Sequence, residues 1–226
     1  MSYSYYEVYT NTQRAFSGIG FPHGADEDAA YIITWLELYN LKGIDLFCSF
    51  IEKFNGQYDY KIDLFNNEKK INLKNKSNLI TGPGIVDYLV SQFNINKINE
   101  HRLINCFDPI FLVPIFSKYI KKKIYAKILN NNEILCLADK EKISIDRKLF
   151  DNKINNSITI NLSNKPNNNQ TLDIDINLKD SVKYLSVGLN PDQKNWDKIE
   201  SLAFKSYVPE SEESRSKGAG GGDAND

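Results

Sequence analysis

Arginine, histidine, cysteine and methionine are scarce in this chain of 226 residues, which contains four Arg, two His, three Cys and one Met. Because the cysteines, at positions 48, 106 and 136, are odd in number and widely spaced, they argue against a disulfide framework. We therefore expect a reducing compartment, the cytoplasm. Neither Cys-x-x-Cys nor His-x-x-x-His spacing occurs, so we predict no metal site of these kinds; a hard-cation site built from acidic side chains is the alternative, and the sequence does not locate one. No motif names a cofactor.

Excess charge of one sign and long apolar runs are also missing. The formal net charge is −1 and the isoelectric point is about 6.2, so no overall field attracts nucleic acid or an anionic membrane. No apolar run approaches the roughly 18 residues that span a bilayer. The opening MSYSYYEVYT has neither the basic nor the apolar region of a signal peptide. We expect neither a nucleic-acid nor a membrane partner.

Asparagine and lysine, by contrast, are abundant. The chain has 27 Asn, and its 28 basic residues comprise 24 Lys and 4 Arg, a bias typical of an AT-rich genome. In such a chain a generic surface cation is Lys, so Arg14, Arg102, Arg147 and Arg215 are of interest. The guanidinium group offers a planar pair of donors that Lys lacks. A structural ion pair is the alternative reason to keep an Arg.

Helical signals dominate the first 54 residues. Ser4 and Glu7 form a capping box, which predicts a helix to about Phe16 that ends at Gly18. A second helix is expected from Ala25, where three acidic residues open an apolar pattern of helical spacing, and a third over IDLFCSFIEKF.

Strand signals dominate the second half. Segments IYAKILN, EILCLAD, KISIDR, SITINLS, LDIDINL and KYLSVGL alternate with period two between Asn-rich loops, and RLINCF, KIDLF and KINLK are further candidates. DPIFLVPIFSKYIKKK, capped by Asp108, and residues 191–207 are expected to be helices. The fold class is therefore α+β: an N-terminal helical layer, a mostly antiparallel β-sheet and a closing C-terminal helix. We assign residues 1–207 to one domain and 208–226 to a flexible Gly-rich acidic tail.

The segment GIGFPHG, residues 18–24, is the first candidate for chemistry. A helix precedes its glycines, so a dinucleotide-binding loop is rejected. The segment could instead hold an anion with Gly20 and Gly24 and carry His23 as a proton-transfer group; a plain turn between two helices is the alternative. His101 is expected on a solvated loop.

LITGPGIVDY is a second candidate. It is expected to be a strand, a Gly-Pro-Gly turn and a helix, with Gly82 and Gly84 either cradling an anion or allowing close packing. The cysteines lie in apolar contexts, which predicts inert core thiols of raised pKa.

Both ends of the chain carry distinctive patterns. RAFSGIGFPHGADEDAAYIITWLELYNLKGI and the terminal SYVPESEESRSKGAGGGDAND together resemble a bacterial family designated domain of unknown function 3726. The resemblance implies that the tail is a native segment, and it brings no known reaction. The positions that match the family pattern are Arg14, Gly18, Gly20, Pro22, Gly24, Trp35, Tyr207, Pro209, Ser214, Arg215, Gly218, Gly220 and Asp226.

Three functions are compatible with these features. The first is a small-molecule metabolic enzyme or metabolite-binding protein for a carboxylate or phosphate, with His23 as the catalytic group. The second is an accessory subunit that binds a partner protein through the tail, and the third is self-association through the tyrosine-rich N-terminus. The ligand-binding residues predicted for the first function are Arg14, Gly20, Gly24, Ser214 and Arg215.

Overall fold

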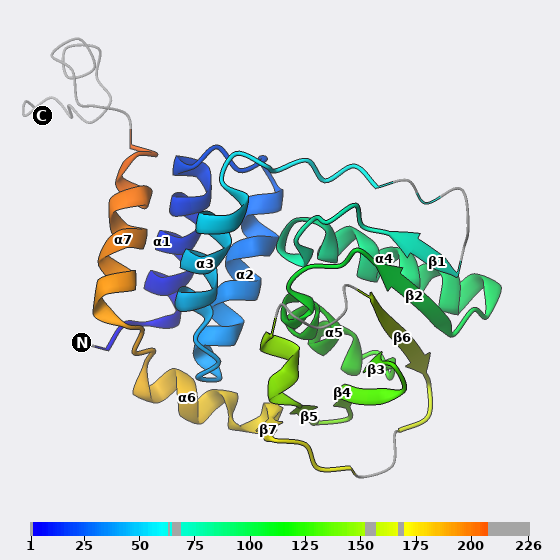
Figure 1. Ribbon diagram of the computed structural model, residues 1–226. Coiled ribbons are helices and arrows are strands. Elements are labelled where there is room, and N and C mark those ends of the chain that lie inside the picture. Colours follow the sequence, from blue (N-terminus) through cyan, green and yellow to red (C-terminus); the bar gives the residue numbers. More distant parts are fainter. Residues whose placement is uncertain (1, 63, 65–68, 152–156, 167–169, 208–226) are drawn as a thin grey trace, which may run out of the picture.

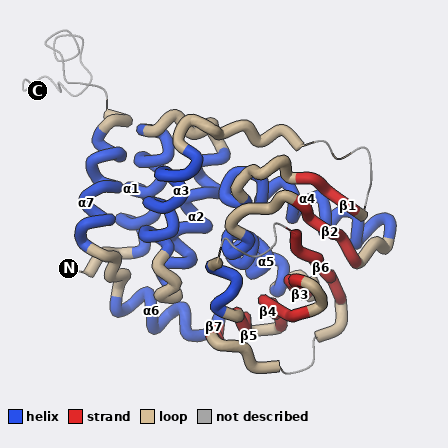
Figure 2. The backbone as a smooth tube through the Cα atoms, viewed as in Figure 1, coloured by secondary structure: helices blue, strands red, loops and turns tan. Residues whose placement is uncertain are grey.

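In the computed structural model a layer of helices lies on one side of the molecule, and the sheet lies on the other together with further helices (Figure 1, Figure 2). The structure describes residues 2–62, 64, 69–151, 157–166 and 170–207. The α-helices are α1 (Tyr5–Gly18), α2 (Ala25–Leu38), α3 (Gly43–Phe54), α4 (Asn78–Asn96), α5 (Leu112–Ile120), α6 (Ser181–Val187) and α7 (Gln193–Phe204). Three short 3₁₀-helices are η1 (Pro109–Phe111), η2 (Arg147–Phe150) and η3 (Leu178–Asp180).

One seven-stranded sheet forms the other side. Its strands are β1 (Lys70–Asn72), β2 (Glu100–Ile104), β3 (Tyr125–Asn130), β4 (Glu133–Asp139), β5 (Lys142–Ile145), β6 (Ser157–Ser163) and β7 (Ile174–Asn177). The spatial order is β1-β2-β6-β3-β4-β5-β7, and every neighbouring pair is antiparallel except β1 with β2. In β6 the side chains alternate between buried and half-buried, as a sheet with one covered face requires. Helix α5 packs on β3 and β4.

The helical layer consists of α1, α2, α3 and α7, which lie side by side (Figure 1). Two glycines permit close crossings within it. A Cβ atom added to Gly18 would lie 2.1 Å from the Leu202 carbonyl oxygen of α7, and one added to Gly43 would lie 2.1 Å from the Ile33 carbonyl oxygen of α2. Helix α2 also packs against α4 and α5, so it joins the helical layer to the sheet side.

Two helix starts show how the sequence sets these elements. At α1 the Ser4 hydroxyl accepts from the Glu7 N–H while the Glu7 carboxylate accepts from the Ser4 N–H, which confirms the predicted capping box. At α3 no side chain of the preceding residue caps the helix. The buried carboxylate of Glu37, from α2, instead accepts from the Ile44 N–H at 3.0 Å.

The predicted fold class is confirmed, as are the three N-terminal helices, the sheet and the closing helix. Residues 78–96, however, form one helix rather than a strand, turn and helix. Its start is fixed by the Ser77 hydroxyl, which accepts from the Leu79 N–H at 3.2 Å, and Pro83 lies within it. The strand predicted over KYLSVGL is also wrong, because Ser181–Val187 is helix α6.

Local expectations also need correction. Asp108 is the N-cap residue of η1, as predicted, but its side chain makes no capping hydrogen bond: its backbone is left-handed, with φ of 53°, and its carboxylate accepts from the Ser77 hydroxyl at 2.9 Å. His101 is fully buried on β2 rather than on a solvated loop. The described part of KIDLF, residues 61, 62 and 64, forms no strand. The Asn cluster 167–169 and the tail 208–226 lie outside the described residues.

Candidate functional site

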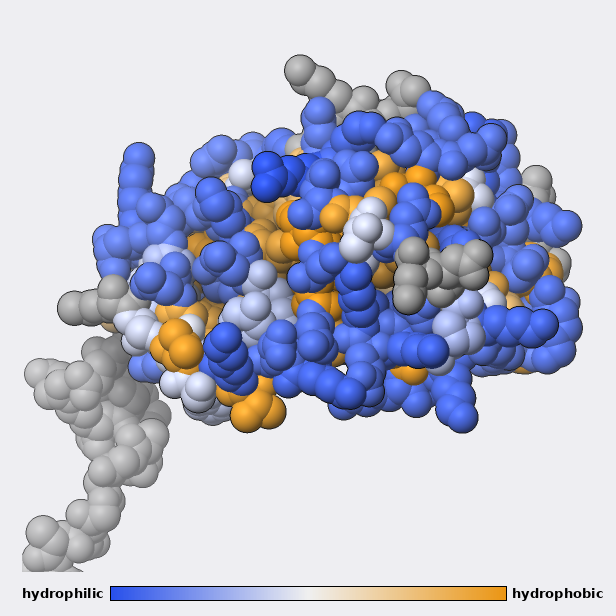
Figure 3. Space-filling view, turned by 90° about the horizontal axis from the view of Figure 1, so that it is seen from below, coloured by the Kyte–Doolittle hydropathy of each residue, from blue (hydrophilic) through white to orange (hydrophobic). Residues whose placement is uncertain are grey.

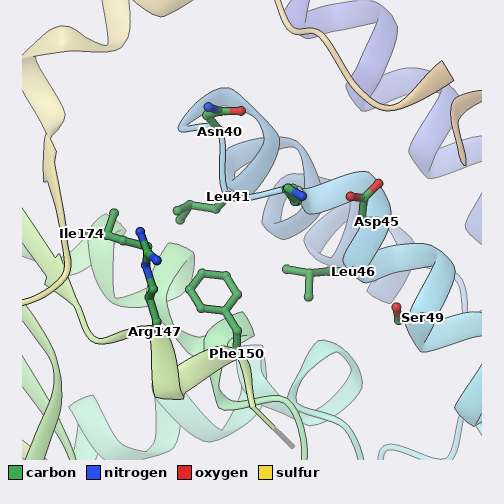
Figure 4. Close-up of a pocket in the computed structure, with 9 residues that line it drawn as sticks. Asn40, Leu41, Asp45, Leu46, Ser49, Arg147, Phe150 and Ile174 are labelled. Atoms are coloured by element: carbon green, nitrogen blue, oxygen red, sulfur yellow. The ribbon is translucent and has the colours of Figure 1, made fainter.

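A pocket of about 380 Å³ lies between the helical layer and the sheet side, and we call it the Arg147 pocket (Figure 4). One wall comes from the α2–α3 connection and from α3, and the other from η2 and the start of β7. Its lining residues are Asn40, Leu41, Lys42, Asp45, Leu46, Ser49, Arg147, Phe150 and Ile174.

The α2–α3 connection is shaped by the way α2 ends. Asn40 is left-handed, with φ of 58°, and its N–H donates to the Glu37 carbonyl at 2.9 Å. The Leu41 N–H donates to the Leu36 carbonyl at 2.8 Å, which completes a Schellman motif. Leu41 is thereby buried, and the next residue, Lys42, projects an exposed side chain at the pocket.

The opposite wall is held by backbone pairing and by two carboxylates. Ile145 of β5 pairs with Ile174 of β7, which places Ile174 beside the start of η2. The Asp173 carboxylate accepts from the Arg147 N–H at 2.9 Å. The Asp146 carboxylate accepts from the Lys148 N–H at 2.8 Å. Since a 3₁₀-helix has about three residues per turn, Arg147 and Phe150 lie on one face. Figure 4 shows Arg147 extending towards Leu41 and Ile174, and the Phe150 ring between Arg147 and Leu46.

The charged side chains of the pocket differ in whether they have a hydrogen-bond or ion-pair partner. The side chains of Arg147 and Lys42 form no hydrogen bond or ion pair with any other residue that the structure describes. Asp45 is engaged, because its Oδ1 accepts from the Asn195 side chain of α7 at 2.7 Å. Burial, and to a smaller extent the charge of Asp45, raise the pKa of Glu37, and the hydrogen bond from Ile44 and the charge of Lys42 oppose that rise.

A larger hollow of about 500 Å³ contains His23, and we call it the His23 hollow. It lies between the α1–α2 connection, residues 60–62 and 64, and the start of α4. Its polar members include His23, Asp28, Tyr60 and Lys61; Asp28 also forms an ion pair with Lys118 at 3.5 Å. The apolar lining comes from Pro22, Ala25, Ile62, Leu64, Ile80, Pro83 and Ile85.

Gly20 and Gly24 shape the connection between α1 and α2. Their φ values are 79° and 83°, a conformation that disfavours side chains. The Asp26 carboxylate accepts from the Gly24 N–H at 2.8 Å and from the Ser17 hydroxyl at 3.1 Å, so the connection is held internally. These contacts give both glycines a conformational reason to be present, and their predicted role in binding stays a prediction.

Arg14 does not line the His23 hollow. It lies exposed on α1, where its guanidinium donates to the Tyr207 hydroxyl at 2.5 Å and sits 5.1 Å from the centre of that ring. Ser214 and Arg215 lie outside the described residues. Among the predicted ligand-binding and catalytic residues, the structure thus places His23 in a hollow and Arg14 against the last residue described.

Two other chemical expectations can be compared with the structure. The three cysteines are buried and form no disulfide, and burial raises the pKa of Cys48 to about 11 and of Cys106 to about 12, which confirms the predicted core thiols of raised pKa. Within the described ranges no group of three or more His, Cys, Asp or Glu side chains is placed to hold a metal ion.

The structure defines the class of protein as α+β, with a pocket where its helical and sheet sides meet. Residues 3–77 match the model of a family described as "Protein of unknown function (DUF3726)", which confirms the resemblance for that stretch. No curated protein and no solved structure matches the chain. None of the helices formed by the described residues is long and apolar enough to cross a membrane.

The matched stretch contains α1, α2 and α3, and with them His23 and the α3 wall of the Arg147 pocket. The η2 wall lies beyond it. The scarcity of arginine drew attention to Arg147 from the sequence, but nothing in the sequence indicated that Lys42 or Phe150 would lie near it.

Proposed function

We propose that the protein binds a small anionic metabolite, a carboxylate or a phosphate, in the Arg147 pocket. The observation that carries this proposal is the pair of cations, Arg147 and Lys42, whose side chains have no partner among the described residues at a concave, partly apolar site. A guanidinium binds carboxylate or phosphate through two parallel hydrogen bonds. Opposite it lie carbon-rich side chains that would cover the rest of a ligand.

The position and size of the pocket also support the proposal. Small-molecule sites are concave and largely apolar with a few polar groups, and their volumes are commonly about 300–1,000 Å³. The Arg147 pocket, at about 380 Å³, lies between α3 and η2 and suits a small metabolite. Asp45, Asp146 and Asp173 each accept a hydrogen bond from an amide N–H of the protein, and none of them forms an ion pair with Arg147 or Lys42.

The proposal concerns binding and does not include a reaction. His23, the predicted proton-transfer residue, lines the separate His23 hollow rather than the Arg147 pocket. Its catalytic role, and any contact of Arg14, Gly20, Gly24, Ser214 or Arg215 with a ligand, therefore stay predictions.

A thermal-shift screen at pH 7.5 with short carboxylates, dicarboxylates, sugar phosphates and inorganic phosphate tests the proposal. A ligand present at 100 times its Kd stabilises the native state by about 2.7 kcal/mol. For a chain of this size that raises Tm by roughly 5–10 °C. We expect Arg147→Gln to abolish the shift and Lys42→Gln to reduce it.

Arg102→Gln is the matched control. Arg102 is also exposed, and its guanidinium donates to the Ser157 hydroxyl at 2.9 Å, far from the pocket lining. This variant should retain the full shift. Equal shifts in wild type and Arg147→Gln, or no shift with any anion, would reject the Arg147 pocket as an anion site.

A second candidate is a non-catalytic protein that associates with another protein chain. Its motivation is α6, which exposes Val182 (74%), Val187 (70%) and Leu185 (47%). Most of the face seen from below is polar, with apolar side chains in separate areas (Figure 3). Exposed apolar groups of this kind favour association. A monomeric mass of the wild type in solution at 100 µM would remove self-association as an explanation for α6.

A further inference from the structure

The polar groups of the Arg147 pocket lie at two ends. Figure 4 shows the Arg147 side chain beside Ile174 and Leu41, whereas Asp45 and Ser49 project from α3 on the other side. Leu46 and Phe150 lie between these ends. The pocket thus offers a guanidinium at one end, oxygen acceptors at the other and hydrocarbon between them.

The acceptor end is built on one helical face. Asp45 and Ser49 are four residues apart on α3, so their side chains lie one turn apart on the same side. The hydrogen bond from Asn195 to Asp45 Oδ1, at 2.7 Å, holds the half-buried carboxylate in place. Its Oδ2 and the Ser49 hydroxyl have no hydrogen-bond partner among the residues described.

A simple anion would use only part of this site. Its charge would satisfy Arg147, but it would offer no donor to Asp45 Oδ2, the oxygen that Asn195 leaves free. Partly desolvating an unpaired carboxylate costs free energy, and a donor on the ligand removes that cost. An ammonium group suits a carboxylate best, because the resulting hydrogen bonds are charge-assisted.

We infer that the ligand of the Arg147 pocket is an amphipathic zwitterion: an anionic group that binds Arg147, a short apolar segment against Leu46 and Phe150, and an ammonium group that binds Asp45 and Ser49. This inference rests on the proposed function of the pocket. It names a narrower class, ω-amino carboxylates or compounds of the same layout, within the anions of that proposal.

Lys42 is the competitor for Asp45. It lines the same pocket and forms no ion pair with Asp45 in this structure. If Lys42 instead neutralised Asp45 in solution, a ligand ammonium group would gain nothing there. A preference for amino-terminated ligands therefore shows whether Asp45 pairs with the ligand ammonium group or with Lys42.

Matched probe pairs test the inference by calorimetric titration at pH 7.5. They are butanoate with 4-aminobutanoate, pentanoate with 5-aminopentanoate, and hexanoate with 6-aminohexanoate. We expect the amino compound of at least one pair to bind at least about tenfold more tightly, the factor that one charge-assisted hydrogen bond supplies. Arg147→Gln should abolish the binding of both members of that pair.

Asp45→Asn separates the two ends of the pocket. It keeps an acceptor for Asn195, so the fold should be retained, and an unchanged Tm in the absence of ligand checks this. The advantage of the amino compound should disappear while the plain carboxylate binds as before. Ser49→Ala, at an exposed position without a packing role, should reduce the advantage by a smaller factor.

The outcomes distinguish the inference from the proposed function. Equal affinities within every pair, or an advantage that survives both Asp45→Asn and Ser49→Ala, would overturn the zwitterion inference and leave the anion site standing. A complete lack of binding by carboxylates and phosphates alike would overturn the proposed function, and the inference with it.

Discussion

Glu37 caps the start of a helix with a carboxylate whose pKa is shifted by its surroundings. Its carboxylate replaces the missing cap at the start of α3 and is 8% exposed. The partial positive charge of a helix N-terminus favours the ionised form, while burial disfavours it. Burial is the larger effect, so the pKa of Glu37 lies above its usual value of 4.5.

This shift predicts a pH dependence of stability. Between the usual and the raised pKa the native state binds more protons than the unfolded chain, so the contribution of Glu37 is present at low pH and is lost as the pH rises through the raised value. Glu37→Gln retains an acceptor for the Ile44 N–H but does not titrate. The unfolding free energy of the variant minus that of the wild type should increase from pH 4 to pH 7.

Urea unfolding at both pH values measures this difference, and the other carboxyl groups cancel because both proteins share them. A difference that is constant with pH, or that falls as the pH rises, would contradict the assignment of a raised pKa to Glu37.

Helix crossings are the relevant feature at the scale of elements. Helices α2 and α3 approach closely because Gly43 has no Cβ atom, and the added atom would lie 2.1 Å from a backbone oxygen that cannot rotate away. Gly84, in α4, is the opposite case, since a Cβ atom there would meet nothing within 4 Å.

We therefore expect opposite effects from the same substitution at these two helical glycines. Gly43→Ala should lower the unfolding free energy by about 1–3 kcal/mol or more through overpacking. Gly84→Ala should raise it by about 0.5–1 kcal/mol, because alanine loses less backbone entropy in a helix. Chemical denaturation of the two variants, each against wild type, checks both signs; destabilisation by Gly84→Ala would show that α4 is not a regular helix there.

The elements also show where prediction from the sequence succeeds. The capping box of α1 and the alternation of β3 to β6 are local signals, and the structure has both elements where those signals place them. Gly82 and Pro83 indicated a turn, yet α4 continues through them. A Cβ atom at Gly82 would lie 3.0 Å from Ile115, so this glycine serves a crossing with α5.

The prediction of a strand where α6 lies was wrong for a different reason. It contains no buried residue, so the alternation of KYLSVGL does not reflect a covered face and carries no structural information. The burial of His101 likewise depends on the pairing of β2 with β6, which the local sequence NEHRL does not specify.

At the scale of the whole molecule, α2 determines whether the protein unfolds as one unit. It packs against α1 and α3 on one side and against α4 and α5 on the other. Both tryptophans, Trp35 on α2 and Trp196 on α7, belong to the helical layer, so tryptophan fluorescence reports on that layer. The circular dichroism signal near 218 nm also includes the sheet. We expect the two signals to give one coincident urea transition, as a single domain over residues 1–207 requires. Transitions with separate midpoints would divide the chain into two domains.

The Arg147 pocket also belongs to this scale. One wall comes from residues 40–49 and the other from Arg147, Phe150 and Ile174, and the two are brought together only when the sheet side docks on the helical layer. Counting arginines could single out Arg147, but its position opposite Asp45 follows from the docking. The sequence analysis likewise predicted that His23 and Arg14 share one site. In the fold, His23 lines the His23 hollow, whereas Arg14 contacts Tyr207.

The pairing of α1 with α7 has a consequence for synthesis on the ribosome. These helices pack along each other, with Trp196 fully buried, although nearly the whole chain separates them. A nascent chain therefore presents the apolar side of α1, including Phe16, long before α7 emerges to cover it. Contacts between such distant segments form slowly, and surface left open in the meantime is prone to aggregate. We therefore expect the helical layer to close last during synthesis, although its first helix is made first.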